Sequence, residues 1–221
     1  MNSDPKNLDP KNLENVDALK ILIISTFIIC VCEAGGAHLG NFLAPVNRIA
    51  VTRLFQISLL AGFLYITPHG IFFAGLSNSK LGHGLKIGLV WSLVFGGVVS
   101  VAALVLFLNQ INPLKLIGSG LPPKNLALFF LTGGLIGPIA EEFYFRGILY
   151  SFLRKSGVFI AMGTTTLIFA LFHFSGDNLP IIQIVGGLVF AVSFEYSKSL
   201  ITPIVIHCLG NLAIFSLSFF L

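Results

Sequence analysis

The stretch KIGLVWSLVFGGVVSVAALVLFLN, residues 86–109, runs for 24 residues with no charged side chain after Lys86. A helix of about 20 apolar residues is long enough to cross the hydrocarbon core of a bilayer. The rest of the chain is similar, since 55% of its 221 residues are hydrophobic and only 10% are charged. Soluble domains carry about 25% charged residues. The sequence therefore predicts an all-α fold, a polytopic transmembrane helical bundle.

Apolar runs predict about seven spans, and the length allows six to eight. The predicted spans are 21–43, 53–77, 86–109, 125–150, 156–175, 179–196 and 200–220. Thr67-Pro68-His69-Gly70 weakens the second run and predicts a break in it. Residues 1–20 are polar and hold a doubled Asp-Pro-Lys-Asn-Leu repeat, so we expect a disordered tail there. A single transmembrane domain is expected over 21–221.

The distribution of lysine and arginine predicts the orientation of the chain. With seven spans, eight of these residues fall on the side of the N-terminus and four on the other, with Arg146 left out as intramembrane. Because positive side chains are enriched in cytoplasmic loops, we expect a cytoplasmic N-terminus. The compact length favours a prokaryotic plasma membrane. The net charge of +4 is spread over connecting segments, so no nucleic-acid partner is indicated.

Three polar clusters interrupt the apolar second half of the chain. They are Glu141, Glu142 and Arg146 in AEEFYFRG, His173 in FALFHF, and His207 with Asn211 in HCLGN. A charged side chain at the centre of a membrane helix costs about 2.5–3.5 kcal/mol on insertion scales. Hydrophobic packing gives no reason to keep such a set, and we expect an intramembrane polar cavity. Glu33 lacks a comparable cluster and is expected to be a helix-packing or cavity residue.

Helical spacing separates two roles within the first cluster. Glu142 and Arg146 are four residues apart, so they share a helix face and lie within reach of an ion pair. Glu141 is rotated from Glu142 by about 100° and can face a cavity. A structural ion pair explains Glu142 and Arg146 but leaves Glu141 without a cation, which makes Glu141 the candidate reactive carboxylate. Pro138 cannot donate to the carbonyl of Gly134, so a kink is expected just before the acids.

Together the clusters supply the groups needed to hydrolyse an amide. A carboxylate and an imidazole can activate a water molecule, and His207 with Asn211 can donate hydrogen bonds to the oxyanion. A covalent nucleophile is not indicated, because G-x-S-x-G is missing and Cys208 projects about 100° away from His207. Two histidines and one or two carboxylates also match some catalytic zinc sites. The H-E-x-x-H signature is missing, and a metal-free site is preferred.

The order of these motifs resembles that of the CAAX-protease and bacteriocin-processing family, often called Abi or CPBP, which contains intramembrane glutamate endopeptidases. The matching motifs are E-E-x-x-x-R at Glu141, F-x-x-x-H ending at His173 and H-x-x-x-N beginning at His207. They are separated by 32 residues from Glu141 to His173 and by 34 more to His207. The resemblance covers about 125–215, which is the expected catalytic core.

The resemblance implies an endopeptidase that hydrolyses a peptide bond of a membrane-associated protein or peptide within the lipid bilayer, without a metal. By similarity, Glu141 and His173 would activate the water, His207 and Asn211 would form the oxyanion hole, and Glu142 and Arg146 would support them. No cofactor is expected, with zinc as the alternative.

Other interpretations of these residues are a non-catalytic immunity or scaffold protein of the same family, a zinc-dependent intramembrane protease, or a small transporter with a proton relay. The transporter would need inverted repeats, and none is evident. One distance conflicts with a shared site: counted from the predicted span ends, His173 lies about 13 Å deeper than His207. Helix tilt, or a start of the 156–175 helix after Gly163, would reduce this difference.

Overall fold

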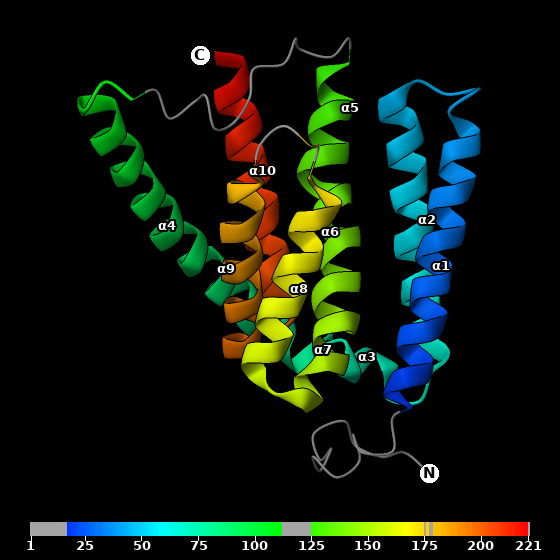
Figure 1. The fold of residues 1–221 in the computed structure, drawn as a ribbon. Coiled ribbons are helices and arrows are strands. Elements are labelled where there is room, and N and C mark those ends of the chain that lie inside the picture. Colours follow the sequence, from blue (N-terminus) through cyan, green and yellow to red (C-terminus); the bar gives the residue numbers. More distant parts are fainter. Residues whose placement is uncertain (1–16, 112–124, 175, 177–178, 221) are drawn as a thin grey trace.

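The structure, a computed structural model, describes residues 17–111, 125–174, 176 and 179–220, and every regular element in these ranges is a helix (Figure 1). The elements are α1 (Ala18–Leu39), α2 (Pro45–Ile66), α3 (Gly70–Phe73), α4 (Asn78–Leu108), α5 (Leu126–Leu131), the π-helical turn η4 (Thr132–Ile136), α6 (Gly137–Glu142), the π-helical segment η5 (Phe143–Tyr150), α7 (Ser151–Leu153), η6 (Arg154–Ser156), α8 (Val158–Phe172), α9 (Ile181–Ser197) and α10 (Ile201–Phe220). Five segments of the described chain are long and apolar enough to cross a membrane, and α8 and α9 are shorter apolar helices. The predicted all-α transmembrane bundle is confirmed.

Three helices, α1, α2 and α4, begin earlier than predicted. α1 starts at Ala18, not after residue 20, because the Asp17 side chain accepts a hydrogen bond from the Lys20 amide at 3.1 Å and caps the helix. Residues 1–16 of the predicted tail lie outside the described residues. α2 starts at Pro45 instead of residue 53, because proline fits the first turn of a helix, where its missing N–H is not needed.

The predicted break within the second run, 53–77, is confirmed. α2 ends at Ile66, His69 adopts a left-handed conformation with φ of 60°, and the short α3 begins at Gly70. α4 then starts at Asn78, ahead of the predicted start at residue 86. It packs along α10 at its lower end and leans away from the bundle at its upper end (Figure 1).

One helical segment, Leu126–Ser156, carries the acids. The disturbance that Pro138 predicts takes the form of the π-helical turn η4, in which the Gly137 amide donates to the Thr132 carbonyl. Pro138 has no N–H, so it cannot donate a hydrogen bond to the Gly133 carbonyl five residues earlier in the chain. Asn211 of α10 takes this role, and its Nδ2 donates to Gly133 O at 2.9 Å.

Small residues let α10 approach this segment closely. A Cβ atom on Gly134 would lie 2.5 Å from Cδ2 of Leu212, and one on Gly133 would lie 2.8 Å from the ring of Phe215. α8 packs along α9, and α1 and α2 form an antiparallel pair beside α6 (Figure 1).

The helices do not begin at one level, which explains why the predicted depth difference between His173 and His207 is wrong. The turn before α8 lies lower in Figure 1 than the turn between α9 and α10, and α8 is tilted across the long segment. α8 begins at Val158, so a start after Gly163 is not the reason. Tilt and the different starting levels together bring both imidazoles close to the same Glu141 oxygen.

Candidate active site

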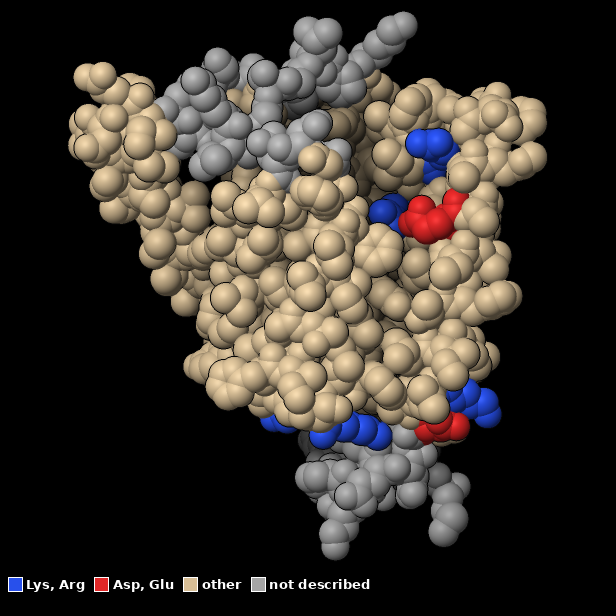
Figure 2. Space-filling model, in the orientation of Figure 1, with Lys and Arg blue, Asp and Glu red and all other residues tan. Residues whose placement is uncertain are grey.

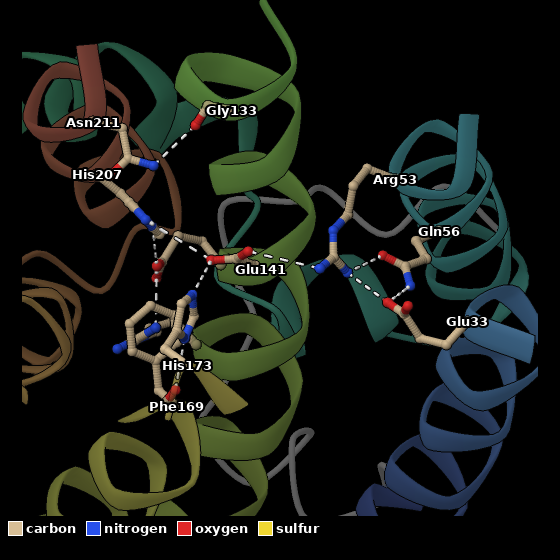
Figure 3. A network of polar contacts seen from close by, with 11 residues as sticks. Glu33, Arg53, Gln56, Gly133, Glu141, Phe169, His173, His207 and Asn211 are labelled. Carbon is tan, nitrogen blue, oxygen red and sulfur yellow. Dashed lines mark hydrogen bonds and ion pairs between the residues drawn. The ribbon is translucent and has the colours of Figure 1, made fainter. Parts of the chain in front are cut away.

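Glu141 lies at the centre of a polar network whose side chains come from helices of both halves of the chain (Figure 3). Its Oε2 is 4.0 Å from His173 Nε2 and 3.9 Å from His207 Nε2. Its Oε1 is 3.9 Å from Nη2 of Arg53. Glu141 belongs to α6, His173 follows α8, His207 belongs to α10 and Arg53 to α2. The structure thus brings the first acid and both predicted histidines together.

His173 is fixed by the end of its own helix. It is the C-terminal cap of α8, and its Nδ1 is 2.8 Å from the carbonyl oxygen of Phe169. A carbonyl can only accept, so Nδ1 carries the proton, and in the neutral ring Nε2 presents a lone pair toward Glu141. The Phe169 ring also packs on the imidazole, with ring centroids 4.5 Å apart. The four-residue spacing of F-x-x-x-H therefore orients the histidine.

His207 is held by the predicted ion pair, which is confirmed. Arg146 Nη1 donates to Glu142 Oε1 at 3.1 Å, with both side chains fully buried. His207 Nδ1 lies 2.8 Å from the same oxygen, so it donates there and leaves Nε2 facing Glu141. Phe190 stacks on the imidazole with centroids 4.4 Å apart, and Arg146 Nη2 donates to the Gly187 carbonyl at 3.0 Å. Glu142 and Arg146 thus set the orientation of His207.

Asn211 lies one turn beyond His207 on α10, on the same side of the network (Figure 3). One hydrogen of its amide group is used in the bond to Gly133. The group has a second hydrogen that this bond does not use. Asn211 therefore ties α10 to the π-helical turn and keeps one donor.

Three residues from the first half of the chain complete the network, and sequence reasoning missed their connection to it. Arg53 Nη1 donates to Glu33 Oε1 and to Gln56 Oε1, each at 2.8 Å, and Gln56 Nε2 donates to Glu33 Oε1 at 2.8 Å. The expectation that Glu141 lacks a cation is wrong, because Arg53 lies 3.9 Å away. The predicted second span, 53–77, places Arg53 at the very edge of the membrane. The start of α2 at Pro45 places it about two turns inside the helix.

A hollow in the upper half of the molecule exposes part of this charged network on the side of α1 and α2 (Figure 2). A pocket of about 180 Å³ lies there, and its charged lining consists of Glu33, Arg48 and Arg53. This pocket therefore reaches Arg53, and Glu141 is not part of its lining.

The Glu141, His173 and His207 side chains are spaced differently from the ligands of a zinc site. Within the described residues, no group of three His, Cys, Asp or Glu side chains is arranged to hold a metal ion. The Glu141 oxygen lies 3.9 and 4.0 Å from the two ring nitrogens. Ligands about 2.1 Å from a tetrahedral zinc ion would be about 3.4 Å from one another. The spacing is wider than that of a zinc site.

Residues 123–213 match the family model described as Type II CAAX prenyl endopeptidase Rce1-like. The resemblance to this family therefore lies in the second half of the chain, around the three motifs. The chain is also 29% identical over 135 residues to the membrane-embedded CAAX protease MroQ of Staphylococcus aureus (strain USA300). This alignment covers 57% of the chain and 53% of the relative, so the chain spans about half the length of the curated relative that it matches. No solved structure matches the chain.

The Rce1-like region contains all seven residues that the three motifs specify. Arg53, Gln56 and Glu33 come from α1 and α2, outside the matched range. The site therefore combines a Rce1-like core with an arginine supplied by the N-terminal pair of helices.

Proposed function

We propose that the chain is an intramembrane endopeptidase that cuts a peptide bond of a membrane-associated protein or peptide without a metal ion. The observation that carries this proposal is the convergence of Glu141, His173 and His207 inside a bundle of apolar helices. The family supports it, because its members are described as CAAX endopeptidases.

The attacking water would lie between Glu141 and His173. Glu141 Oε2 and His173 Nε2 are both acceptors, and at 4.0 Å they are too far apart to bond directly. A water about 2.8 Å from each would donate one hydrogen to each, at an angle of about 90° that a water molecule can meet. Its lone pair would then point away toward a substrate carbonyl carbon. Glu141 would take the proton as the new C–O bond forms, and later pass it to the leaving amine.

The developing oxyanion would be stabilised by His207 and Asn211. Nδ1 of His207 is engaged with Glu142, so in its imidazolium form the ring offers its Nε2 hydrogen on the side of Glu141. Asn211 keeps one amide hydrogen beside it. Removing one donor of this kind typically lowers kcat by about 10²- to 10³-fold. Glu142 and Arg146 act through His207 as positioning residues.

The proposed orientation places the N-terminus in the cytoplasm of a prokaryotic plasma membrane. Lys20, Lys80, Arg154, Lys155 and Lys198 all lie at helix ends on the side of the N-terminus. Positive side chains favour the cytoplasmic face, and the bacterial relative is named as membrane-embedded.

The test compares membrane peptides from cells that contain the wild type or Glu141→Gln, by mass spectrometry, with and without a chelator. We expect peptide ends that depend on Glu141, fall by at least about 10²-fold in the variant and survive chelation. Glu195→Gln is the matched control, because Glu195 pairs with Arg154 at 2.9 Å at the opposite end of the bundle. Identical peptides from wild type and E141Q would favour a non-catalytic scaffold or immunity protein. Loss of cleavage with the chelator would favour zinc.

A further inference from the structure

We propose that Arg53 is a positioning residue for Glu141: held by Glu33 and Gln56, its guanidinium fixes the plane of the Glu141 carboxylate. The inference rests on the proposed function of Glu141 and extends it to a part of the chain outside the Rce1-like region. Arg53 would not touch the reacting atoms, and it would act through Glu141 alone.

Arg53 is held in place by a closed ring of hydrogen bonds. Arg53 bonds to Glu33 and Gln56 through Nη1, and Gln56 bonds back to Glu33, all at 2.8 Å. Gln56 is fully buried, so this ring is anchored between α1 and α2. A guanidinium group is rigid and planar, and fixing Nη1 therefore fixes the direction of Nη2. Nη2 is the atom that faces Glu141 (Figure 3).

The two oxygens of Glu141 have separate neighbours. Oε1 faces Arg53, whereas Oε2 faces the two histidines. The last torsion of a glutamate side chain is broad, so the carboxylate plane rotates easily unless something holds it. Attraction between Oε1 and the guanidinium would hold this plane and keep Oε2 between His173 and His207. Misplacing a reacting group by about 1 Å can cost about 10²-fold in rate.

Neither of the two neighbouring arginines can fix the Glu141 carboxylate in place of Arg53. Arg146 follows Glu141 on the same helical segment, but its Nη1 is bound to Glu142. Arg48 lines the same pocket as Arg53, and its side chain makes no ion pair or hydrogen bond among the described residues. Arg53 is therefore the cation in ion-pair contact with Glu141 in this part of the structure.

A purely structural role would give a different result from a positioning role. If the ring only joined α1 to α2, substitution of Arg53 would lower stability and leave the turnover of the folded fraction unchanged. A positioning role predicts a fall in kcat with little change in KM. The orientation of the Glu141 carboxylate plane affects the chemical step and not the binding of substrate. It also predicts rescue by lysine, which keeps the charge on α2.

The experiment measures kcat, KM and unfolding for wild type, Arg53→Gln, Arg53→Lys and the matched control Arg48→Gln, on a peptide whose cleavage depends on Glu141. We expect R53Q to lower kcat by about 10- to 10²-fold with KM changed less than about twofold. R53K should recover part of this loss, and R48Q should match the wild type. Unchanged kcat in R53Q, equal losses in R53Q and R48Q, or no recovery in R53K would overturn the proposal.

A second measurement keeps the inference separate from the proposed function. The unfolding equilibrium constants of R53Q, Glu141→Gln and the double variant form a cycle that needs no substrate. Direct contact predicts that the two effects are non-additive by at least about threefold in the equilibrium constant. If the wild type cleaves nothing, the proposed function fails. A non-additive cycle would still support the inference that Arg53 positions Glu141. An additive cycle overturns this inference whether or not the chain is active.

Discussion

Replacing Arg146 by methionine tests whether the buried pair beneath His207 is formed. The change removes the bonds from Arg146 to Glu142 at 3.1 Å and to the Gly187 carbonyl at 3.0 Å. It also removes a guanidinium that lies 5.0 Å from the Phe169 ring centre and 5.3 Å from that of Phe190. Both members of the ion pair are fully buried, so solvent does not weaken their interaction. Losing one partner of such a pair destabilises a protein by about 3–5 kcal/mol.

Equilibrium unfolding in mild detergent, titrated with SDS, measures this loss. The single tryptophan, Trp91 of α4, packs against Tyr196 of α9 with ring centroids 6.2 Å apart, so its fluorescence reports on helix packing. We expect R146M to lose about 3–5 kcal/mol. The double variant R146M/E142Q should be more stable than R146M, because the neutral amide no longer needs a cation. A double variant less stable than R146M would refute this reasoning.

Two further predictions concern the π-helical turn and use the same titration. Asn211→Ala should lower the free energy of unfolding by about 1–3 kcal/mol, because the Gly133 carbonyl loses its donor; a loss below about 0.5 kcal/mol would contradict the bond. Gly134→Ala should destabilise by about 1–3 kcal/mol, because the new Cβ would lie 2.5 Å from Leu212 Cδ2. This loss should largely vanish when G134A is made in a Leu212→Ala background, and an equal loss in both backgrounds would argue against the close contact.

Local spacing explains why much of the site was predictable from sequence. Glu142 and Arg146 are one helical turn apart, and this alone predicts their ion pair. The rotation of Glu141 away from Glu142 predicted that it would face elsewhere, and it faces His173 and His207. Polar groups among apolar helices need partners, so their convergence follows from the free energy of burying each one alone.

The contribution of Arg53 could not be predicted, because it depends on where a helix begins. A charged residue at the edge of an apolar run fits both a loop and a first helical turn, and only the proline at 45 favoured the longer helix. The relative depth of His173 and His207 was wrong for a related reason. Residue counts give distance along a helix, whereas tilt and starting level come from packing between helices.

The widened turn at Thr132–Ile136 also sets the rotational phase of the chain that follows it. A π-helical turn holds about one residue more than an α-helical turn, so it acts as a single-residue insertion that rotates the preceding helix by about 100° against the following one. Removing one residue from this π-helical segment would change the rotation of α5 relative to α10, or it would rotate the two acids away from the histidines. Alignments of related chains should therefore allow a one-residue gap here, between two blocks that each keep their own register.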